Sequence, residues 1–235
     1  MLTCIEIATF LDSVLSRHLY PEEIPAIWKE SPRPIKRLGL ALEPDSYLAE
    51  WIKQEAMDAV FLHRPWKLAT YPVPDDITFF SSHLPFDEQL TVGFNRILAN
   101  RLKLTDIKVL GTKEGRPVGM SGTIPVQMDA AFCKILDELF QGLESSFQLT
   151  GKTIHKVAFV GAMTAQLIEN AANQGVELYC TGQFREPARR AALATSMSIV
   201  AVGHKRSELF GLSLLADLLS TKWPELTIIP RIPAI

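Results

Sequence analysis

Residues 37–63 read RLGLALEPDSYLAEWIKQEAMDAVFLH, and this stretch decides the fold. Two short apolar runs, residues 37–42 and 59–62, flank a segment with helical spacing at residues 47–56. Residues 43–46 have the composition of a turn and helix cap between the first run and the helix. A strand, a helix and a second strand in this order predict a βαβ unit with parallel strands and the helix packed on one face.

The rest of the chain continues this alternation, which is typical of α/β proteins. We predict further helices at residues 5–19, 88–104, 128–143, 164–173, 186–195 and 207–219, and further strands at residues 77–82, 156–160, 177–180, 198–202 and 227–229. Between these elements, residues 111–122 hold four glycines and a proline. This segment marks either a hairpin or a junction between two halves.

The length of 235 residues allows one large α/β domain or two smaller ones. We predict two similar α/β domains, residues 1–112 and 113–235, each with a mainly parallel sheet and flanking helices. The C-terminal elements of such a chain can also pack back on the first domain.

Composition excludes several classes of protein. Hydrophobic residues make up 47% and charged residues 21% of the chain, as in globular proteins. A net charge of -2 gives no basic field for nucleic acid, and no apolar run reaches the roughly 18 residues that span a bilayer. The N-terminal residues lack a basic segment followed by an apolar one, so we expect a cytoplasmic protein. Three cysteines without a CxxC arrangement predict reduced, packed thiols.

Two histidines, His63 and His204, directly follow predicted strands, where open α/β sheets bind ligands. Asp87 lies shortly after another predicted strand, and Glu208 follows His204 by four residues. Imidazole and carboxylate groups together suit first-row divalent metals. Each residue also has a structural explanation: Asp87 as a helix cap, Glu208 as a partner of a helix dipole, and His63 as a hydrogen-bonded core histidine.

Four short motifs carry a resemblance to a known family. LHRP at residues 62–65 resembles its HHP element, HLPFD at 83–87 its HTNLD element, YCTGQ at 179–183 its YITGE segment, and GHKRSE at 203–208 its GHxxSE element. Their order and spacing also agree. From about Arg37 onward the chain thus resembles the NGG-interacting factor three-like proteins, also known as GTP cyclohydrolase type two homologues.

The resemblance implies two α/β domains that face each other across a metal-binding cleft, and a homo-oligomer, specifically a homohexamer. It implies a divalent ion such as Zn, Fe or Mn, one or two per chain, and no other cofactor. Carried over position by position, the metal ligands fall on His63, Asp87, His204 and Glu208. The family's usual proposed reaction is metal-dependent hydrolysis of a small molecule.

The second histidine of the HHP element falls on Arg64 in this chain. A guanidinium group stays protonated and cannot donate a lone pair to a metal, so one ligand is missing. Either the charge of Arg64 replaces that of a second ion and leaves a one-metal site, or Arg64 turns to solvent or pairs with a neighbouring acid and metal binding is only weakened.

The resemblance therefore implies a metal-dependent hydrolase with a modified site. In that interpretation Arg64 stabilises negative charge in the transition state, and His83, outside the carried-over ligand set, is a general base or a partner of a ligand. The alternative is a non-catalytic structural or regulatory member of the family with a degenerate site, which the missing histidine favours.

Overall fold

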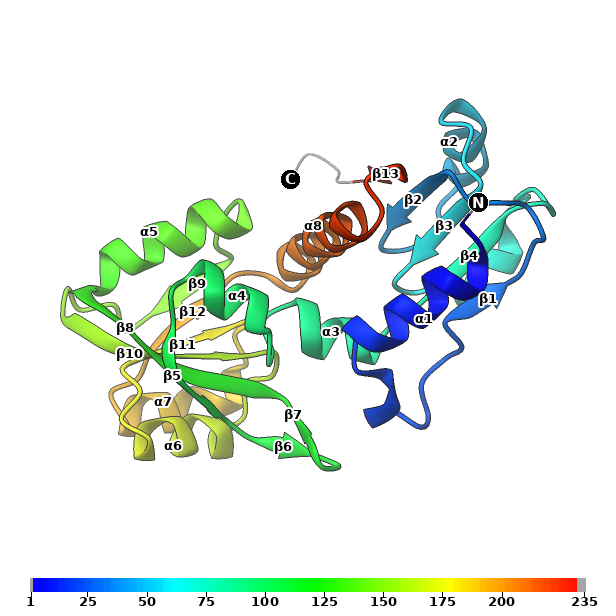
Figure 1. The fold of residues 1–235 in the computed structure, drawn as a ribbon. Coiled ribbons are helices and arrows are strands. Elements are labelled where there is room, and N and C mark those ends of the chain that lie inside the picture. The colour runs from blue at the N-terminus through cyan, green and yellow to red at the C-terminus, as the bar shows by residue number, and fades with distance from the viewer. Residues whose placement is uncertain (1, 232–235) are drawn as a thin grey trace. The chain divides into compact units, whose positions relative to one another are not determined.

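The computed structural model describes residues 2–231, which form a mixed α/β fold with eight α-helices and three sheets (Figure 1). The chain divides into two compact units: the first contains the residues up to 86 and those from 211 onward, and the second contains residues 87–210. The predicted division between residues 112 and 113 lies inside the second unit, within the short strand β6 (Thr112–Lys113).

The first unit contains a five-stranded sheet in the order β1-β4-β3-β2-β13. Its strands are β1 (Ile27–Lys29), β2 (Arg37–Ala41), β3 (Ala59–Leu62), β4 (Thr78–Ser81) and β13 (Thr227–Pro230). Only β1, at one edge, is antiparallel to its neighbour. The βαβ prediction is confirmed, because α2 (Leu48–Gln54) joins β2 to β3 and these strands pair in parallel.

Helices cover the buried strands of this sheet. Helix α2 packs Leu48 and Ile52 against Val60 of β3 in one apolar cluster. Side chains alternate between the two faces of a strand, so Phe61 points to the opposite face. There its ring lies 5.9 Å from that of Phe86 in α3 (Leu84–Leu90).

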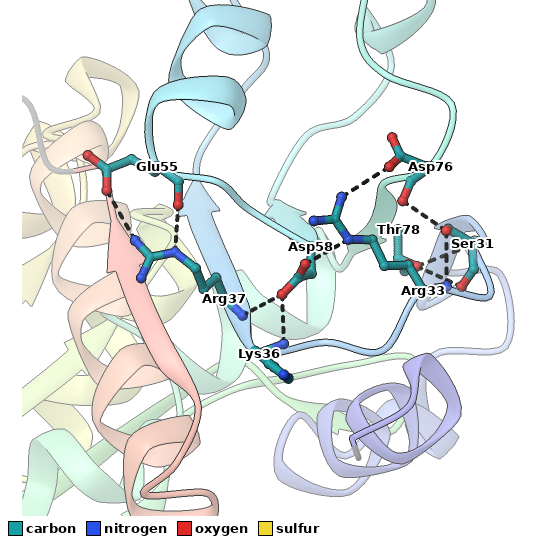
Figure 2. A network of polar contacts seen from close by, with 8 residues as sticks. All are labelled: Ser31, Arg33, Lys36, Arg37, Glu55, Asp58, Asp76 and Thr78. Atoms are coloured by element: carbon teal, nitrogen blue, oxygen red, sulfur yellow. Dashed lines mark hydrogen bonds and ion pairs between the residues drawn. The ribbon is translucent and has the colours of Figure 1, made fainter.

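A buried carboxylate, Asp58, fastens the amino ends of these parallel strands (Figure 2). It directly precedes β3 and accepts hydrogen bonds from the backbone N–H groups of Lys36 at 2.9 Å and Arg37 at 3.0 Å. The guanidinium of Arg33 adds an ion pair at 2.8 Å and reaches Asp76 at 3.0 Å. Asp58 therefore links β2, β3 and the segment before them.

The second unit contains a six-stranded sheet in the order β5-β8-β10-β11-β12-β9. Its strands are β5 (Thr105–Val109), β8 (Gly119–Met128), β9 (Ser145–Phe147), β10 (Thr153–Val160), β11 (Leu178–Thr181) and β12 (Ser198–Ala201). Only β10, β11 and β12 run parallel to one another, and the other three pairings are antiparallel. The expectation of mainly parallel sheets is therefore wrong for this unit.

The long strand β8 accounts for most of this error. Gly119, Gly122 and Pro125 are residues that ordinarily interrupt strands, and they concealed it in the sequence. Just before it, β6 and β7 (Arg116–Pro117) form the hairpin that was one of the two alternatives for this segment. Its turn residues, Glu114 and Gly115, have φ angles of 51° and 79°, the left-handed values that a two-residue hairpin turn requires.

Helices lie on both faces of the second sheet (Figure 1). Helices α6 (Ala165–Asn173) and α7 (Arg189–Ala194) pack against the face that carries Ala158 and Val160. Phe159 points the other way and meets Phe132 of α5 (Asp129–Phe140), with ring centroids 6.4 Å apart.

A carboxylate binds backbone N–H groups in this sheet as Asp58 does in the first one. Glu177, directly before β11, accepts hydrogen bonds from the backbone N–H groups of His155 at 2.8 Å and Lys156 at 3.1 Å. In both units, an acid that directly precedes one parallel strand thus binds backbone N–H groups of the neighbouring chain segment, just before the point where the two strands begin to pair.

The predicted helix at residues 88–104 is wrong, because the structure has two helices there, α3 and α4 (Arg96–Arg101). Asn95 begins α4, and its side chain accepts hydrogen bonds from the N–H groups of Ile97 and Leu98, both at 3.0 Å. At Gly93 the chain passes so close to α3 that an added Cβ atom would lie 2.6 Å from the carbonyl oxygen of Glu88. The apolar spacing continues through this break and concealed it.

We expect Gly93→Ala to lower the free energy of unfolding by about 1–2 kcal/mol, because the new methyl group must displace backbone of α3. Urea unfolding measures this change. Gly182→Ala is the matched control, since its Cβ would meet no atom closer than 3.7 Å. Equal stability of the two variants would contradict the close approach at Gly93.

The cysteines and the remaining helices agree with the sequence predictions. Cys4, Cys133 and Cys180 are free and buried, and burial raises the pKa of the Cys133 thiol to about 11. Helix α1 (Cys4–Val14) and the long α8 (His204–Lys222) complete the set. Within the described residues, no helix has the length and apolar character needed to cross a bilayer.

Candidate metal centre

The carboxyl ends of β3 and β4 carry the two histidines of the candidate site. His63 directly follows β3 and is completely buried, and His83 comes two residues after β4. Because β3 and β4 are parallel neighbours, both histidines leave the sheet at the same edge. Asp87 lies one turn further on, as the fourth residue of α3.

One donor atom from each of His63, His83 and Asp87 lies within 4.8 Å of the other two. A tetrahedral zinc ion with bonds of about 2.1 Å holds its ligand atoms about 3.4 Å apart. Side-chain movements of about an ångström would therefore bring the three atoms to bonding distance of one ion. Two imidazoles and one carboxylate also form a donor set that such ions bind.

The orientation of His63 is fixed by its neighbours. Its Nδ1 atom lies 2.9 Å from the carbonyl oxygen of Ser82, which can only accept a hydrogen bond. Nδ1 therefore carries the proton, and the lone pair is on Nε2, the arrangement found in metal-binding histidines. The ring packs 4.7 Å from Phe86 and 5.1 Å from His83 between centroids. His63 is thus the buried, hydrogen-bonded histidine of the structural alternative, and the tautomer that this bond selects is also one that suits a metal ligand.

His83 lies closer to the site than its expected role suggested. We placed it outside the ligand set, yet its donor atom clusters with those of His63 and Asp87. The structural alternative for Asp87 is wrong, because α3 begins at Leu84 and Asp87 is inside the helix.

The second unit repeats this arrangement with His204 and Glu208. Helix α8 begins at His204, just after β12, and Glu208 follows one turn later. His204 Nε2 lies 2.9 Å from Glu208 Oε1, with the His204 side chain 62% and the Glu208 side chain 1% exposed. The shared sequence pattern, a histidine after a strand and an acid four residues later, is the signal that could have identified His83. That His63 and His204 bind a common ion stays a prediction.

Arg64 pairs with a neighbouring acid. Its Nε atom lies 2.7 Å from Glu43 Oε1, and the two side chains are 19% and 49% exposed. Glu43 follows β2, the strand next to β3, so the loops beyond two adjacent strands carry the pair. The positive charge of Arg64 is therefore balanced, at least in part, by this carboxylate.

The family and its known relatives match nearly the whole chain. The model of the Duf34/NIF3 (NGG1p interacting factor 3) family matches residues 27–231. A protein of Chlamydia pneumoniae named "GTP cyclohydrolase 1 type 2 homolog" is 25% identical over 240 residues, which cover 93% of this chain and 94% of that protein.

Solved structures share the fold. The chain matches ybgI, a protein of unknown function, with a TM-score of 0.79, 18% identity and 99% coverage of both chains. It matches TTHA1606 of Thermus thermophilus with a TM-score of 0.73 and 18% identity, also over 99% of both chains. The resemblance deduced from the motifs is thereby confirmed: the chain belongs to the Duf34/NIF3 family.

Proposed function

We propose that this protein is a metal-dependent hydrolase in which His63, His83 and Asp87 bind one divalent ion. The convergence of two imidazoles and one carboxylate within 4.8 Å supports this proposal most strongly. Catalytic metal sites typically have three protein ligands of this kind and keep a position open for water or substrate. A bound ion would lower the pKa of such a water toward neutrality and so provide a nucleophile for hydrolysis.

The chain's own residues hold and complement that centre. The Ser82 carbonyl fixes the tautomer of His63, and Asp87 supplies negative charge that offsets part of the charge of the ion. Arg64 lies next to His63 in the chain and offers a guanidinium group to an anionic substrate or to negative charge in the transition state. Its bond to Glu43 sets the direction of that group.

A single ion per chain is the occupancy we propose. Arg64 occupies the position at which the family motif has a second histidine, and it cannot bind a metal. We expect metal analysis of the purified protein to find one equivalent per chain, and Arg64→His to raise this number toward two. Two equivalents in the parent protein would contradict the one-metal proposal. They would not contradict the proposal that His63, His83 and Asp87 bind an ion.

Hydrolysis itself is tested by a screen of phosphate esters, nucleotides and cyclic amides with added Mn, Zn or Fe. Activity in the parent that Asp87→Ala abolishes would support the hydrolase. Arg64 favours the second candidate, a non-catalytic family member. It replaces the second histidine of the family motif, and it is paired with Glu43. Activity that appears only in Arg64→His would support that candidate.

Three further proposals go beyond the His63, His83 and Asp87 cluster. We propose that His204 and Glu208 contribute to metal binding, that the protein forms homohexamers, and that it acts in the cytoplasm on a small molecule. Metal titration of Glu208→Gln tests the first of these. Light scattering coupled to gel filtration tests the second.

A further inference from the structure

We infer that Glu23 is a positioning residue of the metal centre: its carboxylate fixes the start of α3, the helix that carries Asp87 and begins next to His83. Glu23 Oε1 accepts a hydrogen bond from the His83 N–H, and Oε2 accepts one from the Leu84 N–H, both at 3.0 Å. The two contacts join residues 60 and 61 positions apart in the chain. This inference rests on the proposed function, because it concerns the same metal centre.

The identity of the residue at the helix start explains why a distant acid is needed. A helix leaves its first N–H groups without partners, and a Ser, Thr, Asp or Asn just before the first turn ordinarily supplies an acceptor. In α3 that position is held by His83, whose ring belongs to the cluster with His63 and Asp87. An imidazole has a single lone pair, so a His83 ring that binds a metal cannot also accept hydrogen bonds from the helix N–H groups. Glu23 supplies the missing acceptor.

The chain around Glu23 is itself tied to the strand that leads into the site. The Ser81 hydroxyl donates to the Pro25 carbonyl at 2.8 Å, and the Ser81 N–H donates to the Ala26 carbonyl at 2.9 Å. Ser81 is the last residue of β4, so the segment just after Glu23 and the strand just before His83 form one hydrogen-bonded structure. The carboxylate is therefore held in place before any ion binds.

The contact acts on both His83, just before α3, and Asp87 within it. The His83 backbone is bonded directly to Glu23, and Asp87 lies one helical turn beyond the second bond. The negative charge also complements the positive end of the helix dipole. Without the carboxylate, the first turn of α3 loses its anchor, and the donor atoms of His83 and Asp87 spread over a wider range of positions.

The test compares Glu23→Ala and Glu23→Gln with the parent protein in a titration with Co²⁺, whose visible spectrum reports the ligand geometry. Loss of groups that orient metal ligands typically costs 10–100-fold in affinity, and we expect Glu23→Ala to lose about that much. Glu23→Gln keeps one acceptor oxygen, so we expect an intermediate affinity. At saturating Co²⁺ we expect the spectrum of each variant to differ from that of the parent.

Thr3→Ala is the matched control, because Thr3 caps α1 in the same unit through its bond to the Glu6 N–H at 3.3 Å. We expect this variant to lower the melting temperature by a few degrees and to leave the Co²⁺ affinity and spectrum unchanged. If the Glu23 variants keep the Co²⁺ affinity and spectrum of the parent, as Thr3→Ala is expected to, the positioning role is overturned. Binding of Co²⁺ by the parent would still support the proposed metal centre in that case. A parent protein that binds no Co²⁺ would overturn both.

Discussion

Replacing His63 with alanine is expected to lower the affinity of the protein for Zn²⁺ or Co²⁺ by more than about a hundredfold. Loss of a residue that only orients a metal ligand already costs 10–100-fold, and His63 is itself proposed as a ligand. Its donor atom lies within 4.8 Å of those of His83 and Asp87, and the bond of Nδ1 to Ser82 places the lone pair on Nε2. Isothermal titration of the metal-free protein measures the change.

His18→Ala is the control for this experiment, because His18 is an exposed histidine outside the cluster. We expect it to bind the ion as the parent does, and circular dichroism should show the same fold for both variants. If His63→Ala binds as tightly as His18→Ala, the cluster is not the metal centre and the hydrolase proposal falls with it.

The second large effect is expected at Asp58, where alanine should lower the free energy of unfolding by about 2–4 kcal/mol. The substitution removes the acceptor of two backbone N–H groups, those of Lys36 and Arg37, and leaves Arg33 without its buried partner (Figure 2). The Asp58 side chain is only 10% exposed, so water replaces these bonds poorly. Urea unfolding of the metal-free protein gives the value.

Asp76→Ala isolates the contribution of burial, because Asp76 pairs with the same Arg33 at 3.0 Å but its side chain is 67% exposed. Exposed ion pairs contribute little, so we expect a loss below about 1 kcal/mol. Comparable losses in the two variants would show that Asp58 does not fasten the strand ends as proposed.

The sequence was sufficient to predict the four parallel strands of the first sheet, β2, β3, β4 and β13, because they are short apolar runs with clear turns and helices between them. The second unit was harder, since the antiparallel partners of its sheet have no such pattern. Strand β8 contains Gly119 and Pro125, and β5 is mostly exposed, so neither has the apolar run of a buried strand. The break between α3 and α4 depends on the close approach at Gly93, a contact that periodicity does not report.

At the site, the positions after predicted strands identified both His63 and Asp87, and the structure brings their donor atoms into one cluster. His83 was expected to be a general base or a partner of a ligand. The ligands were carried over from the family motifs, and His83 was not among them. The support from Glu23 could not be predicted, because it depends on the folded path of a segment 60 residues away in the chain. Local patterns thus predicted which residues leave the strands, and tertiary contacts decided how they are held.

Strand β3 carries Asp58 immediately before its first residue and His63 immediately after its last, so its four residues separate the anchor from the proposed chemistry. The same strand thus carries a buried ion-pair anchor at one end and a proposed metal ligand at the other. Substitutions meant to raise thermal stability can therefore be placed around Asp58 while His63 stays unchanged. Such variants would show whether stability can be raised separately from the proposed metal binding.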